Sequence, residues 1–181
     1  MLFDFISRPI AITDVETTGL DPAMHEIIDI GLVVVNQKTL EIIETLDVRV
    51  KPKNIKTATS FALNLNGYNE ADWQNALTLQ EAMRLYSAKT EEAIFAAHNV
   101  TFDWSFIFEA FNKTKIRNLM DYHRIDLFTM AWLKLKDSGL KKFNGDAIAK
   151  HLGLKEEPLP HRGINGAMKA YEVFKKLIEI K

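Results

Sequence analysis

The segment Ile27 to Val35 reads IIDIGLVVV and consists almost entirely of β-branched and other aliphatic residues. It is too short to cross a membrane as a helix, which requires about 20 apolar residues. Its composition favours a β-strand instead. Two further strands are indicated on either side of it along the chain, over Pro9 to Thr13 and over the alternating stretch Leu40 to Val50. We therefore expect three antiparallel strands from one meander.

The remainder of the chain predicts alternating helices and strands. Apolar residues at helical spacing are found in Leu79–Leu85, Asp103–Phe111, Phe128–Lys136, Asp146–Leu152 and Ile164–Ile178. Short strands are indicated at Ala93–Ala97 and Arg124–Leu127, whereas residues 52–75 have an irregular pattern with turn residues. This order predicts an α/β fold with a mixed central sheet of about five strands flanked by helices. With 181 residues, 47% of them hydrophobic, we expect a single domain over residues 1–181.

The composition excludes several classes of function. There is no cysteine, which rules out disulfides, thiol nucleophiles and thiolate metal sites. Lys and Arg total 23 and Asp and Glu total 24, so the chain lacks the positive charge that tight duplex binding requires. A nucleic-acid enzyme stays compatible with this balance, because bound cations add charge that the sequence does not contain. No apolar run reaches the length of a membrane span, and we expect a soluble, cytoplasmic protein without a membrane partner.

Asp14 and Glu16 lie at the end of the first predicted strand and are two residues apart. Side chains at this spacing in a strand point to the same face, so the two carboxylates should lie together. Like charges this close repel each other unless a cation sits between them. An isolated pair of this kind is more often a solvated acidic turn. The pair indicates a functional site only if other polar groups converge on it.

Two later segments place polar residues at the starts of predicted helices. In HNVTFD, Asn99 lies in a turn and Asp103 opens a helix, and in HRGING, His161 precedes the last helix. Each residue also has a structural explanation: a turn residue, a first-turn acid favoured by the helix dipole, and an exposed histidine. Asp126, near the last predicted strand, is interpreted as structural and only a distant ligand candidate.

Taken together, DVETTG (residues 14–19), HNVTFD (residues 98–103) and HRGINGA (residues 161–167) resemble the motifs of the DEDDh family of 3′-to-5′ exonucleases. The likeness is greatest to DnaQ-like members such as the proofreading epsilon subunit of bacterial DNA polymerase III. It runs over almost the whole chain, since DAIAKHLGL (residues 146–154) also resembles the helix before the last motif. Each motif alone would match many unrelated sequences, but all three in this order are specific to the family. The resemblance implies an RNase H-like fold.

The resemblance also implies roles for individual residues. Asp14, Glu16 and Asp103 are expected to hold two Mg²⁺ or Mn²⁺ ions, with His161 as the general base. The 3′-terminal nucleotide and the ordering of the site would involve Thr17, Thr18, Asn99 and Phe102. Hard cations prefer oxygen ligands and stabilise charge on the attacked and leaving oxygens of a phosphodiester, while histidine exchanges protons near neutral pH. The expected substrate is the 3′ end of single-stranded DNA or RNA, and a DNA polymerase subunit is a candidate partner.

One position departs from the family pattern. In the family an Asp follows the catalytic His by five residues and completes the first metal site, and here that position is Gly166. Asn165 cannot substitute for it, because successive residues in a helix are rotated by about 100°. Loss of one carboxylate should weaken the binding of Mg²⁺ more than that of Mn²⁺.

Three explanations of Gly166 stay open at this point. The chain is an engineered, disabled variant, a natural enzyme with weakened or one-metal catalysis, or a relative that binds nucleic acid or a polymerase without cutting. The retention of Asp14, Glu16, Asp103 and His161 favours descent from an active exonuclease. A further alternative is an α/β domain of other function with solvated acids at its strand ends. The choice between DNA and RNA rests on contacts to the 2′-OH, which the sequence does not place.

Overall fold

The computed structural model describes residues 4–180 and contains a five-stranded mixed sheet with the strand order β3-β2-β1-β4-β5. The strands are β1 (Ile10–Thr17), β2 (Ile27–Val35), β3 (Ile42–Arg49), β4 (Ile94–Ala97) and β5 (Arg124–Asp126). The first three strands form an antiparallel meander, and β1, β4 and β5 run parallel to one another. The predicted meander and mixed α/β sheet are confirmed.

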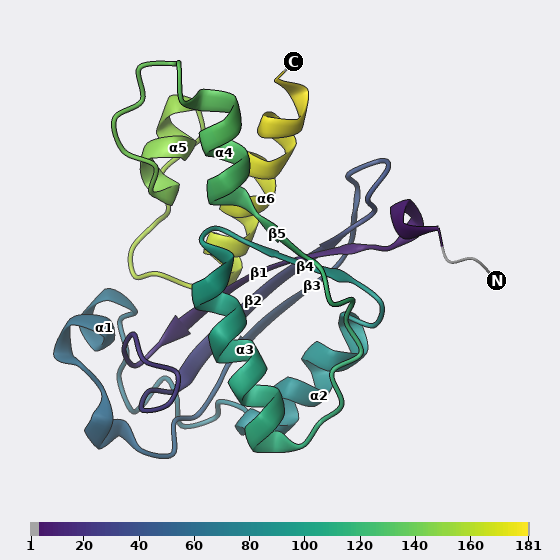
Figure 1. Cartoon of the computed structure of the whole chain (residues 1–181). Helices are drawn as coiled ribbons and strands as arrows, with labels where there is room; N and C mark the ends of the chain where they lie inside the picture. The colour runs from purple at the N-terminus through teal and green to yellow at the C-terminus, as the bar shows by residue number, and fades with distance from the viewer. Residues whose placement is uncertain (1–3, 181) are drawn as a thin grey trace.

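Helices cover both faces of this sheet. They are α1 (Ser60–Leu65), α2 (Leu79–Lys89), α3 (Val100–Thr114), α4 (Leu127–Leu135), α5 (Gly145–His151) and α6 (Gly163–Glu179), with short 3-10 helices at Phe5–Ser7 and Ile55–Thr57. Figure 1 shows α2 and α3 on one side of the sheet and α4, α5 and α6 on the other. Among the described residues, no helix combines the length and apolar character needed to cross a membrane.

Each face of the sheet has its own hydrophobic core, and β1 contributes to both. Ala11 and Val15 pack with residues of α2 and α3, whereas Ile10 and Ile12 pack with residues of α4, α5 and α6. This division follows from the alternation of side chains along a strand. Even-numbered residues of β1 therefore point towards α6.

Strand β1 continues past the apolar run that ends at Thr13. It includes the acids expected at its end and extends through Thr17, because β2 pairs with it along this stretch. Asp14 and Glu16 are thus residues of the sheet itself, on the face that α6 covers. Their common orientation is set by the strand, as the two-residue spacing predicts.

Helix α1 lies in the segment for which the sequence predicts no regular structure. It has only six residues, too few to display a helical period. The residues at its end make two long-range contacts. The carbonyl of Leu65 accepts the backbone N–H of His161 at 3.2 Å, and the side chain of Asn66 donates to the carbonyl of Thr17 at 3.1 Å. This segment therefore anchors both the end of β1 and the loop before α6.

The first turn of α6 lies directly on the sheet. A Cβ added to Gly31 in β2 would lie 1.9 Å from the carbonyl of Gly163, so a larger residue would separate helix and sheet. Beside this contact Arg162 donates to Asp29 in β2 at 2.7 Å and to Asp47 in β3 at 2.6 Å. The close backbone approach and the two ion pairs fix the start of α6 over β1.

Candidate functional site

A cavity of about 310 Å³ opens where β1 runs past the end of β4. It is bounded by β1, the turn between β4 and α3, the loop before α6, and α6 itself. The predicted site residues that line it are Asp14, Glu16, Asn99, Phe102, Asp103, His161 and Gly166. Segments that are far apart in the sequence thus converge, as the joint motif pattern predicts.

Asp103 is held against β1 by a backbone hydrogen bond. In the described part of the chain β4 pairs with β1 only over Ile10–Ile12, so the N–H of Val15 lies beyond the reach of that strand. The Oδ1 atom of Asp103 accepts this N–H at 3.0 Å. A buried backbone donor requires a partner, so the end of the β1/β4 pairing fixes where this carboxylate lies. Asp103 is in the first turn of α3 and only 4% exposed.

The carboxyl groups of the cavity destabilise one another's charge. Burial raises the pKa of Asp14 to about 7, and the nearby carboxylate of Glu157 adds to the rise. Burial likewise raises the pKa of Glu16 to about 8, with Asp14 as the next cause. The pKa of Asp103 is raised well above its ordinary value by burial and by Asp14. A bound cation would stabilise the ionised forms of all these groups.

Asn99 and Phe102 border the cavity from the start of α3. Asn99 is exposed and adopts a left-handed backbone conformation with φ of 57°, and its side chain makes no capping bond to the helix. Its amide is therefore not committed to the helix end. Phe102 is half-buried one turn later and presents an aromatic side chain to the cavity.

Thr17 and Thr18 are buried and lie outside the lining of the cavity. The hydroxyl of Thr17 donates to the carbonyl of Gly19 at 2.7 Å, and that of Thr18 accepts the N–H of Glu26 at 2.9 Å. Both side chains shape the turn that follows β1. Their contact with a nucleotide stays a prediction.

Asp126 has a structural role in the protein as it stands. Its carboxylate accepts the N–H of Val100 at 3.0 Å and the N–H of Thr129 at 3.0 Å, which secures the start of α3 and caps α4. It is not among the residues that line the cavity.

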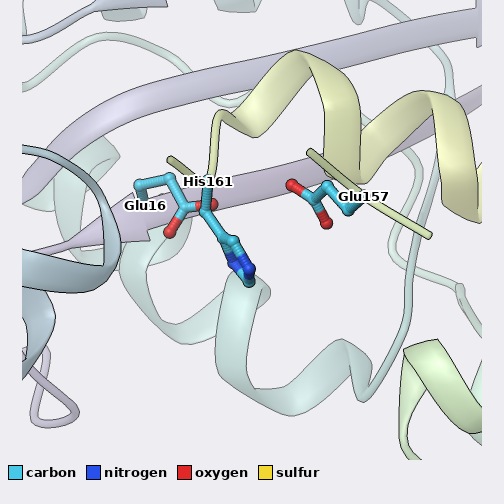
Figure 2. A group of neighbouring side chains, drawn as sticks. All are labelled: Glu16, Glu157 and His161. Atoms are coloured by element: carbon cyan, nitrogen blue, oxygen red, sulfur yellow. The ribbon is translucent and has the colours of Figure 1, made fainter. Parts of the chain in front are cut away.

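Glu157 is a residue of the site that the sequence motifs did not single out. It lies in the loop between α5 and α6, and its side chain is only 5% exposed. Lys169 on α6 donates to its Oε2 atom at 2.7 Å. Ligand atoms of Glu16, Glu157 and His161 all lie within 4.8 Å of one another, and Figure 2 shows the carboxylate of Glu157 pointing towards the other two side chains.

Gly166 faces the carboxylate of Asp14. A Cβ at position 166 would lie 2.4 Å from Oδ2 and 2.5 Å from Cγ of Asp14. The Asp14 carboxylate therefore occupies the space in which a side chain at 166 would begin. Asp14 can hold this position only because residue 166 has no side chain.

The raised pKa values predict that pH and divalent cations act together on stability. Folding raises the pKa of Asp14 from 3.8 to about 7 and that of Glu16 from 4.5 to about 8, so these groups favour the folded state in their neutral forms. That contribution is complete below about pH 4 and is lost as pH rises through 7 to 8. Without cations we expect the melting temperature to fall progressively from about pH 4 to about pH 8 and to level off above that, once both groups are ionised in the folded state.

A divalent cation binds the ionised carboxylates, so its stabilising effect should grow over the same range. Melting curves with Mn²⁺ and with a chelator, recorded at about pH 6 and pH 8.5, measure this difference. Equal cation-induced shifts at both pH values would contradict the assignment of these carboxyl groups to a cation site.

The strand order β3-β2-β1-β4-β5 with helices on both faces defines the class of fold, which is RNase H-like. Within that class the chain belongs to the exonuclease family, whose profile, described as "Exonuclease", matches residues 11–174. The prediction that the chain is a member of an exonuclease family is thereby confirmed.

Two relatives illustrate this membership. The chain is 30% identical over 167 residues to the PolC-type DNA polymerase III of Caldanaerobacter subterraneus subsp. tengcongensis, a match that covers 92% of this chain and 11% of the relative. It is 34% identical over 112 residues to the 3′-5′ exonuclease DinG of Staphylococcus aureus, which covers 59% of this chain and 12% of that protein. The chain therefore spans only about a tenth of the length of these relatives.

A solved structure agrees with the fold. The nuclease domain of 3′hExo, described as a DEDDh family member bound to rAMP, matches with a TM-score of 0.73 at 20% identity. The match covers 96% of this chain and 92% of that domain. At this level of identity the likeness establishes the shared fold.

Proposed function

We propose that the chain is a 3′-to-5′ exonuclease that hydrolyses phosphodiester bonds at the 3′ end of single-stranded DNA, or RNA, with Mg²⁺ or Mn²⁺ as cofactor. The observation that carries the proposal is the convergence of Asp14, Glu16, Asp103 and His161 on one cavity. Membership of the exonuclease family supports it. Because one relative is a DNA polymerase, DNA is the proposed substrate and a DNA polymerase the proposed partner.

The residues present fit hard divalent cations. Asp14, Glu16 and Asp103 offer carboxylate oxygens, the ligands that Mg²⁺ and Mn²⁺ prefer. A fourth carboxylate, that of Glu157, has a buried Oε1 atom without a hydrogen-bond partner among residues 4–180. An uncompensated buried oxygen of this kind is costly unless a ligand completes its environment. Because of their carboxylate oxygens, Asp14, Glu16 and Asp103 would hold the cations.

The chain's own side chains divide the remaining tasks. When bound, divalent cations stabilise charge on the phosphate oxygens and help to activate the attacking water. His161 accepts the proton of that water. This role requires the imidazole to lie within hydrogen-bond distance of the water, and the position of His161 beside Glu16 is compatible with it. Asp103 keeps its position through Val15, and Phe102 offers a face on which the terminal base can stack.

Gly166 favours a second candidate function. With Asp14 filling the space beside Gly166 and no Asp at that position, the chain would be a nucleic-acid-binding module that does not cut. This alternative predicts binding of an oligonucleotide without shortening. The four retained side chains favour the enzyme, since a binding module needs no such convergence of titratable groups.

The two candidates are separated by incubating the protein with a 5′-labelled single-stranded oligonucleotide. We expect a ladder of products shortened from the 3′ end with Mn²⁺, weaker cleavage with Mg²⁺, and none with a chelator. An oligonucleotide with phosphorothioate linkages at its 3′ end serves as the control and should resist. Binding of the oligonucleotide with no shortened product in either metal would support the non-cutting module.

A further inference from the structure

Glu157 combines two properties that a structural ion pair does not explain. Its side chain is only 5% exposed, and Lys169 engages one oxygen, Oε2, at 2.7 Å. The other oxygen, Oε1, is buried and has no partner among the described residues. A carboxylate that served only as a counter-ion would gain by turning this oxygen to a donor or to water.

The unpartnered carboxylate belongs to the cavity of the proposed function. Glu157 lines that cavity, and its ligand atom lies within 4.8 Å of those of Glu16 and His161 (Figure 2). Ligands on opposite sides of an octahedral Mg²⁺ are about 4.2 Å apart, from bond lengths of about 2.1 Å. The spacing therefore suits side chains that share one cation or its bound waters.

We propose that Glu157 is a ligand of the active-site cation and replaces the carboxylate that Gly166 lacks. The inference rests on the proposed function, because it assigns a ligand within the same site. Asp14, Glu16, Asp103 and Glu157 together restore a set of four carboxylates. The fourth comes from the loop before α6 rather than from α6.

Lys169 acts as the positioning residue for this ligand. It lies on α6 three residues after Gly166, on nearly the same face of the helix. Its ammonium group also donates to Asp146 at 2.9 Å, and its own side chain is 16% exposed. By holding one oxygen of Glu157 beside α6, it fixes this carboxylate in the lining of the cavity that Glu16 shares.

The proposal is tested by measuring Mn²⁺ binding to the full chain by calorimetry, beside the cation-induced shift in melting temperature. We expect Glu157→Gln to weaken Mn²⁺ binding by about 10- to 100-fold or more, the range found for groups that support metal ligands. The matched control is Glu156→Gln, an identical change at the exposed neighbouring residue, which should keep the wild-type affinity. Unchanged affinity in Glu157→Gln would overturn the proposal.

A double variant guards against a purely structural effect. In a Gly166→Asp background a carboxylate returns to α6, so the loss of affinity caused by Glu157→Gln should shrink. A loss of the same size in both backgrounds would show that Glu157 acts independently of position 166. It would overturn the proposal that Glu157 replaces the carboxylate missing from that position. If wild type binds Mn²⁺ and cuts but Glu157→Gln matches it, only this inference fails. If neither wild type nor Gly166→Asp binds the ion or cuts, the proposed function fails with it.

Discussion

Replacement of His161 by glutamine is expected to lower the rate constant for 3′-end cleavage by about 10²- to 10⁴-fold, the usual contribution of a general base. The imidazole lies with Glu16 and Glu157 in the cavity, and glutamine keeps hydrogen-bonding capacity but cannot take up the proton. The residue is held in place through its backbone N–H, which donates to Leu65, so the substitution should leave the fold intact.

The measurement is single-turnover cleavage of the labelled oligonucleotide with Mn²⁺, together with a melting curve. His151→Gln provides the matched control, since His151 is exposed in α5 and does not line the cavity. We expect its rate and melting temperature to stay at the wild-type values. A His161→Gln protein that cuts as fast as the control would remove histidine from the proposed mechanism.

Gly166→Asp is expected to raise cleavage with Mg²⁺ by at least about tenfold, because it returns a carboxylate ligand that a strongly hydrated ion needs. The gain depends on Asp14, whose carboxylate would lie 2.4 Å from the new Cβ and must turn aside. Without cations the crowding and the added negative charge should destabilise the fold by about 1 to 3 kcal/mol. The same substitution therefore lowers the melting temperature in chelator and enlarges the rise produced by Mg²⁺.

Gly166→Ala separates the two effects of this substitution. It introduces the same Cβ against Asp14 without a carboxylate, so it should show crowding without any gain in cleavage. Cleavage rates in Mg²⁺ and melting temperatures in chelator, compared across wild type and both variants, give the two effects independently. If Gly166→Asp is no more active than Gly166→Ala, the missing carboxylate is not what limits the enzyme.

The order of helices and strands was predictable because it depends on local patterns. The aliphatic run Ile27–Val35 became β2 over the same residues, and the apolar stripe of the last helix became α6 within one residue at each end. The acids of β1 were placed on one face by their spacing alone. The end of β1 was not predictable, since it depends on pairing with β2 rather than on the residues of β1 themselves.

Glu157 is the clearest case that the sequence could not resolve. In EEPLPH the two glutamates look alike, and only the fold exposes Glu156 while it buries the side chain of Glu157 beside Lys169. No periodicity marks a residue in an irregular loop. Its role depends on a contact with α6 that is twelve residues away in the chain.

The periodicity of strands and helices in the sequence determined the fold class, and the resemblance of three motifs to those of an exonuclease family indicated that Asp14, Glu16, Asp103 and His161 converge. Only the tertiary structure decided what surrounds Gly166. Asp14 lies in the space of the absent side chain, and Glu157 lines the same cavity with one carboxylate oxygen buried and without a partner among the described residues. Such placements depend on packing between distant segments, and in particular on how closely Gly31 and Gly163 let α6 approach the sheet.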